Sequence, residues 1–180
     1  MSQNFGRLIV RLVIGGLFIG HGTQKLFGWF GGGGPEATGQ YFEGVGLRPG
    51  KQHALAAGTA EAGGGVLLAA GLATPVAAAS LIGVMLTAIR KVHWERGPWV
   101  SSGGFEYNAV LVAVLFALAE RGPGKLSLDR ALGTERCGER WALLALGAGA
   151  AGSYLATRIS EEPPSEQRPA ESREPVAAAA

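Results

Sequence analysis

The chain has 180 residues, of which 47% are hydrophobic and 17% are charged. Glycine accounts for a further 30 residues. Soluble domains carry about 25% charged residues, so this composition favours a membrane protein. The formal net charge of +2, without a basic face carrying interleaved aromatics, argues against nucleic-acid binding. The single cysteine, Cys137, excludes an internal disulfide and any CxxC redox or zinc motif.

Four hydrophobic segments, at 8–27, 54–72, 73–89 and 105–119, predict membrane-spanning helices, and a fifth lies at 141–156. The first resembles a secretory signal but has no clear cleavage site, so we interpret it as a retained span. A spanning helix needs about 20 residues, and the last three segments are shorter. They nevertheless lack the polar stripe of a soluble bundle helix. We therefore predict an all-α integral membrane four-helix bundle with a fifth hydrophobic helix.

The connecting segments differ in character. Residues 28–53 are expected to form a long glycine-rich loop, and residues 90–104 a polar loop. The link between the second and third spans is very short, which predicts an antiparallel hairpin. Residues 131–158 are assigned as a basic linker followed by the fifth helix. Residues 159–180 lack periodicity and are rich in Glu, Pro, Ser and Ala, which predicts a disordered tail.

Small residues are spaced for close helix packing in lipid. The sequence contains Gly16-x-x-x-Gly20, a Gly63-Gly64-Gly65 run and Ala148-x-x-x-Gly152. Such residues let helix backbones approach closely enough for van der Waals contact to hold them together. We expect these positions to form helix interfaces.

Polar residues inside the spans gather toward one side of the membrane. If the helices alternate in direction, His21 and Glu61 both lie about 9–10 Å from the same boundary, given 1.5 Å per residue. Gln24 and Lys25 share the helix face of His21. The predicted polar pocket comprises His21, Gln24, Lys25, Glu61, Arg90, Glu106, Tyr107 and Asn108. The opposite side is expected to hold no buried charge except Arg11.

A charge within the bilayer costs about 2.5–3.5 kcal/mol on insertion scales, so such residues are functional candidates. Pairing of Lys25 and Arg90 with Glu61 and Glu106 would offset much of this cost, and the network then either locks the helices together or serves a ligand. Three other interpretations stay open. They are haem ligation by His21 with a loop residue, His53 or His93; nucleophilic catalysis by Ser101 or Ser102; and a metal site from His21 and Glu61. We assign no catalytic residue and no metal.

Several motifs in chain order resemble the DoxX family over residues 5–130. They are Phe18-x-x-His21-Gly22-x-Gln24-Lys25-Leu26-Phe27-Gly28, Glu61-x-Gly63-Gly64, Gly103-Gly104-Phe105-Glu106-Tyr107-Asn108 and Gly122-Pro123-Gly124-Lys125-Leu126-Ser127-Leu128-Asp129. The resemblance implies a bacterial four-helix membrane domain, related to the small subunit of thiosulfate–quinone oxidoreductase. It brings no catalytic residue set with it.

The resemblance and the polar pocket together suggest a membrane component of a redox or oxidative-stress-linked complex that interacts with quinone. If it takes part in catalysis, we expect a subunit of a membrane oxidoreductase rather than a self-sufficient enzyme. Its expected partners are the lipid bilayer, a peripheral redox protein and a second copy of the chain, with no covalently bound cofactor. The alternatives are a non-catalytic membrane anchor or assembly protein, and a small-solute transporter.

The distribution of basic residues predicts the orientation of the chain in the membrane. The N-terminal side carries slightly more Lys and Arg than the side of the two long loops, which places the N-terminus in the cytoplasm. We expect a multi-pass protein of the bacterial plasma membrane, with the long loops facing outward.

Overall fold

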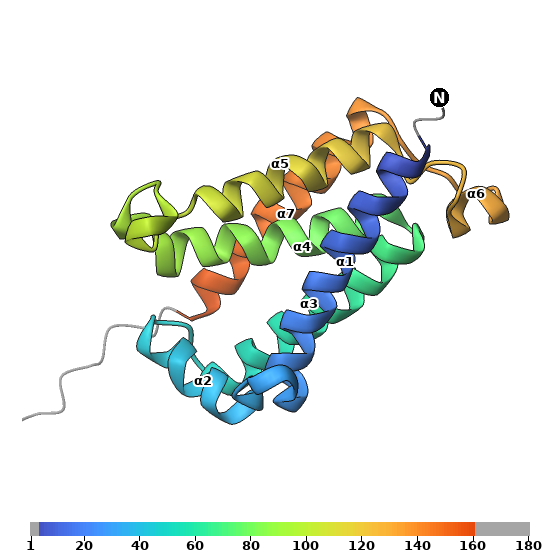
Figure 1. The fold of residues 1–180 in the computed structure, drawn as a ribbon. Coiled ribbons are helices and arrows are strands. Elements are labelled where there is room, and N and C mark those ends of the chain that lie inside the picture. Colours follow the sequence, from blue (N-terminus) through green and yellow to red (C-terminus); the bar gives the residue numbers. More distant parts are fainter. Residues whose placement is uncertain (1–3, 161–180) are drawn as a thin grey trace, which may run out of the picture.

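The computed structural model describes residues 4–160, and within this part of the chain all regular structure is helical (Figure 1). The five long helices are α1 (Asn4–Phe27), α3 (Gly50–Ala70), α4 (Thr74–Ala88), α5 (Glu106–Arg121) and α7 (Glu139–Ile159). The short helices are α2 (Gly34–Gly44) and α6 (Leu128–Leu132). The all-α bundle is confirmed, and the fifth hydrophobic segment is a full helix. The predicted disordered tail falls almost entirely outside the described residues.

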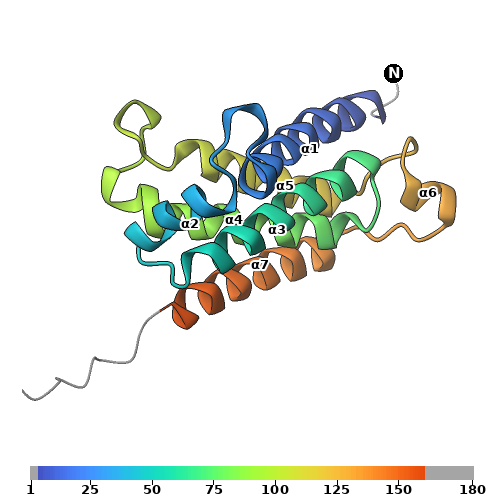
Figure 2. The same cartoon turned by 90° about the horizontal axis from the view of Figure 1, so that it is seen from below.

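The long helices alternate in direction, so α1, α4 and α7 run one way while α3 and α5 run the other (Figures 1 and 2). We call the end where α1 begins the N-terminal end; it also holds the α3–α4 turn and α6. The opposite end, called the loop end, holds α2 and the segment between α4 and α5. Helices α1 and α3 form one closely packed pair and α4 and α7 another, joined by contacts of α3 with α4, while α5 packs on α4 and α7.

Three helical stretches within residues 4–160 are long and apolar enough to cross a membrane: Asn4–Phe27, Thr74–Arg96 and Glu139–Ile159. Large apolar side chains such as Ile9, Val13, Leu144 and Leu155 are exposed on the outside of the bundle, where lipid would cover them. The third span is longer than predicted, because α4 continues through a π-helical turn, Ile89–His93, and a 3₁₀ turn, Trp94–Arg96. Residues 90–96 are therefore helical, and the predicted loop at 90–104 was wrong for them.

The expected loop at 28–53 is also partly helical. Pro35 starts α2 in its first turn, a position where proline costs no hydrogen bond. Helix α2 is then fixed to the start of α3 by two contacts: Lys51 Nζ lies 2.5 Å from Glu36 Oε1, and the Gly50 N–H donates to Glu43 Oε1 at 3.1 Å. Because α3 begins at Gly50, His53 belongs to a helix and not to a loop.

Glycines hold α1 against α3: Gly65 of the predicted Gly63-Gly64-Gly65 run is one of them, but on α1 they are not the predicted ones. An added Cβ at Gly15 would lie 2.6 Å from the Gly65 carbonyl oxygen, and one at Gly22 would lie 2.7 Å from the Gly58 carbonyl oxygen. A Cβ at Gly16 or Gly20 would meet nothing within 4 Å. The prediction of Gly16-x-x-x-Gly20 as an interface was wrong, because α1 turns its Gly15 and Gly22 face toward α3.

Helices α4 and α7 approach each other in the same manner. An added Cβ at Gly149 would lie 2.9 Å from the Ala79 carbonyl oxygen, whereas one at Gly152 would meet nothing within 4 Å. Gly149 is therefore the close-contact residue of α7, and the expected role of Gly152 in helix packing was wrong.

The N-terminal end is closed by two buried charged residues. Arg11 is 1% exposed and donates to the carbonyl oxygens of Leu68, Ala69, Leu126 and Pro123. Asp129 is 2% exposed and accepts from the N–H groups of Ala73 and Thr74 at 3.0 and 3.2 Å and from two threonine hydroxyls. Arg11 thus bonds carbonyl groups of the last turn of α3, and Asp129 bonds N–H groups at the start of α4. Such terminal groups lack the usual partner within their helix. The expectation of an almost uncharged N-terminal half missed Asp129.

The glycine contact between α1 and α3 gives a first prediction. Gly22→Leu should destabilise the protein by about 1–3 kcal/mol or more, since the side chain has no room against α3. Gly20→Leu, on the same helix but without a neighbour, should leave stability nearly unchanged. Thermal unfolding in detergent measures both variants, and an equal loss of stability would contradict the assigned interface.

The direction of α7 gives a second prediction. A topology reporter fused after Asp129 and another fused after Ser160 should report opposite sides of the membrane, because α7 runs the length of the bundle between them. Reporters on the same side would show that α7 does not cross.

Candidate functional site

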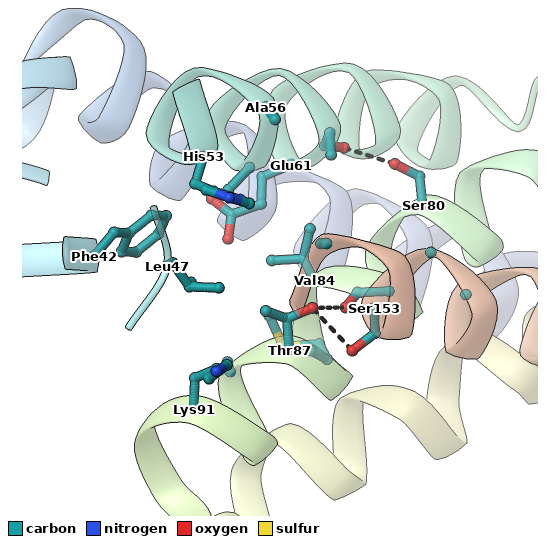
Figure 3. A pocket seen from close by; sticks show the side chains of 18 of the residues that line it. Phe42, Leu47, His53, Ala56, Glu61, Ser80, Val84, Thr87, Lys91 and Ser153 are labelled. Atoms are coloured by element: carbon teal, nitrogen blue, oxygen red, sulfur yellow. Dashed lines mark hydrogen bonds between the residues drawn. The ribbon is translucent and has the colours of Figure 1, made fainter. Parts of the chain in front are cut away.

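Two cavities lie between the helices, extending toward the loop end. The larger, of about 640 Å³, is bounded by α3, α4 and α7, with α2 at its end (Figure 3). The smaller, of about 240 Å³, is bounded by α1, α4 and α5. Four residues line both cavities and so form the wall between them: Lys25, Glu61, Met85 and His93.

The centre of this wall is an ion pair. Lys25 Nζ lies 2.5 Å from Glu61 Oε2, and the side chains are 20% and 4% exposed. A buried carboxylate needs such a partner, since leaving it unpaired in an apolar medium costs several kcal/mol. Lys25 also donates to the His21 carbonyl oxygen at 3.4 Å.

The position of the ion pair follows from the glycine contact described above. Gly22 lies against Gly58 where α1 meets α3, and Lys25 and Glu61 each come three residues later. Residues three apart lie on neighbouring parts of one helix face. Because the helices run in opposite directions, the two residues are offset along the helix axes, and the long lysine side chain spans this offset to reach the carboxylate.

Five of the eight predicted pocket residues line the smaller cavity: His21, Lys25, Glu61, Tyr107 and Asn108. They come from α1, α3 and α5, which agrees with the prediction that polar residues of different spans lie at a similar depth in the membrane. Asn108 is 7% exposed, and its amide Nδ2 donates to Met85 Sδ at 3.4 Å. A thioether is a weak acceptor, so a carbonyl oxygen in the cavity would be a better partner for this amide.

The other three predicted residues line neither cavity. Gln24 donates to the Phe30 carbonyl oxygen at 3.4 Å, and the Arg90 guanidinium lies 6.0 Å from the centre of the Tyr154 ring. Glu106 Oε1 accepts from the Val100 N–H at 2.7 Å, which fixes the preceding turn. The ion pair between Lys25 and Glu61 forms as expected, whereas Arg90 and Glu106 have these other partners.

Sequence reasoning missed two features of the site. His93 was expected in a loop, but it ends the π-helical turn, lines both cavities and donates from Nδ1 to the Gly103 carbonyl oxygen at 2.7 Å. The nitrogen bonded to a carbonyl must carry the proton, so in the neutral ring Nε2 is an acceptor. The second feature is α7, whose Gly149, Gly152 and Ser153 line the larger cavity. The apolar run from Val76 is broken by Arg90 and Lys91 just before His93, so the sequence offered little signal that the helix continues to it.

Comparison with known proteins gives one match. The model of the DoxX family matches residues 6–94. This part of the chain belongs to the DoxX family. No curated protein and no solved structure matches the chain.

The DoxX segment covers α1 to the π-helical turn, and it contains the whole wall between the cavities. Together with the three apolar helical stretches, it establishes a membrane protein whose environment is the lipid bilayer. The match ends before Tyr107, Asn108 and α7. The extension of the domain to residue 130 stays a prediction, as do the boundaries at 131–158 and 159–180.

The buried ion pair gives a third prediction. Lys25→Met should destabilise the protein by about 3–5 kcal/mol, because Glu61 is left buried without a partner. The double variant Lys25→Met/Glu61→Met should recover most of this loss. Thermal unfolding of the single and double variants in detergent tests it, and additive losses would show that the two side chains do not depend on each other.

Proposed function

We propose that this DoxX protein is a membrane component of a redox complex, and that the smaller cavity binds the ring of a quinone. The observation that carries the proposal is a cavity inside a membrane bundle, lined by Lys25, Glu61, His93, Tyr107 and Asn108 beside apolar side chains. Ionisable residues at such depth are costly, and they usually mark a ligand or proton path.

The chemistry of these side chains suits a ring with two carbonyl groups. The Asn108 amide and the Lys25 ammonium are hydrogen-bond donors, and a quinone carbonyl is an acceptor. Reduction of a quinone to a quinol takes two electrons and two protons. In this proposal a peripheral redox protein delivers the electrons, and Glu61, His21 or His93 exchanges the protons with the ring oxygens.

The cellular setting belongs to the same proposal. The protein would lie in a bacterial plasma membrane with its N-terminus in the cytoplasm, so that the loop end and both cavities face outward. The peripheral partner would then dock on the loop end, close to the cavities. A homo-oligomer is compatible with this arrangement.

Binding of menadione, a naphthoquinone without a long tail, tests the proposal by titration calorimetry on the purified protein. Asn108→Leu, which keeps the approximate size of the side chain, should weaken binding about two- to tenfold through loss of one hydrogen bond. Glu61→Gln should also change the affinity, because the charge facing the ring is removed.

Glu36→Gln is the matched control, since Glu36 forms the exposed ion pair with Lys51 outside both cavities. It should bind menadione like the unaltered protein. Unchanged binding in both Asn108→Leu and Glu61→Gln would overturn the assigned site. If Glu61→Gln only lowers expression and no variant affects binding, the anchor interpretation is favoured instead.

A further inference from the structure

The larger cavity is a groove with apolar walls. Helix α4 forms its floor and α3 and α7 its sides; α3 and α7 both pack on α4 but make no extensive contact with each other. Ala56 of α3 and Gly152 of α7 line the groove and are exposed. The groove therefore opens sideways on the outer surface of the bundle, where the hydrocarbon of the bilayer lies.

The lysine, histidine and carboxylate side chains that line the groove are Lys25, His53, Glu61, Lys91 and His93. Glu61 is the carboxylate of this set, and Lys25 neutralises it. His53 Nε2 lies 2.8 Å from Ser160 Oγ and 3.3 Å from the Arg48 carbonyl oxygen, and His93 is bonded to Gly103. Lys91 forms no hydrogen bond or ion pair with any other residue of the described range 4–160, so its positive charge is uncompensated there.

Lys91 lies at the loop end of the groove, beyond Thr87 and facing Leu47 (Figure 3). Phe42 and Leu47 line the same end, so a head group bound beside Lys91 has apolar neighbours. Deeper in the groove the polar groups are hydroxyls that bond within the protein: Thr87 Oγ1 donates to Ser153 Oγ at 3.0 Å, and Ser80 Oγ to the Ala60 carbonyl oxygen at 3.2 Å.

We propose that this groove binds one long-chain fatty acid, with its hydrocarbon chain between α3 and α7 and its carboxylate on Lys91. Within residues 4–160 Lys91 is the one lysine of the groove without a partner, and one such cation at the end of an apolar groove matches a molecule with one negative charge and one chain. A volume of about 640 Å³ lies within the range of about 300–1,000 Å³ that small-molecule sites occupy. The site is separate from the proposed quinone cavity, because the ion pair of Lys25 and Glu61 stands between them.

Electron paramagnetic resonance tests this binding in the full chain, reconstituted in phosphatidylcholine vesicles. The probe is stearic acid with a nitroxide on its chain, above the pH at which the acid ionises in the bilayer. Its methyl ester is the matched ligand, since only the charge differs. The acid should show several-fold more of the motionally restricted, protein-bound component than the ester.

Two variants locate the site. In Lys91→Gln the protein-bound component of the acid should fall to that of the ester. Lys51→Gln, which removes a lysine already paired with Glu36, should still bind more acid than ester. Gly152→Leu places a side chain in the groove and should lower the bound component of the acid. Gly147→Leu is the control on the same helix, because Gly147 is also exposed and without neighbours within 4 Å but lies outside the groove.

Equal binding of acid and ester by the unaltered protein would overturn the proposal, and so would a preference that survives Lys91→Gln. Spin-labelled phosphatidylglycerol provides a further outcome: if it is held as strongly as the acid, the groove recognises phospholipid and the assignment to a fatty acid fails. Because Gly152 is absent from the smaller cavity, menadione binding by Gly152→Leu should be unchanged. The menadione titration therefore tests the quinone cavity and the stearic acid spectra test the groove, so either proposal can fail without the other.

Discussion

The close approach of α1 and α3 is the constraint on which the rest of the structure depends. Within lipid no hydrophobic effect drives helices together, so van der Waals contact between backbones must do it. Gly15 with Gly65 and Gly22 with Gly58 permit this contact along the length of the two helices. The same contact brings Lys25 within side-chain reach of Glu61, and the ion pair then divides the space beside α4 into two cavities.

The two ends of the bundle use charge differently. At the N-terminal end Arg11 and Asp129 are almost fully buried, and their hydrogen bonds go to helix ends and to the segment between α5 and α7. These groups stabilise the fold and have little capacity left for a ligand. Toward the loop end, Lys25, Glu61, His93 and Asn108 face open space, and the partner of the Asn108 amide is a weak one. The binding that we propose therefore lies in that half.

Much of the site was predictable because its geometry is local to each helix. Alternating spans put His21 and Glu61 at one depth, and helical spacing put Lys25 beside them, so three members of the smaller cavity follow from position along the chain. Arg90 and Glu106 were grouped with them on depth alone. Depth says nothing about rotation about the helix axis, and the structure turns Arg90 toward Tyr154 and Glu106 toward Val100.

The sequence by itself determined the hydrophobic helices, their alternation and the gathering of polar residues toward one end, because these depend on composition and on distance along a helix. Only the tertiary structure decided which glycines touch. Gly15 and Gly16 are chemically identical neighbours, and the rotation of α1 about its axis places Gly15 against α3. The tertiary structure also decided that α7 packs on α4, so that α3 and α7 stand apart. The groove with Lys91 exists for that reason.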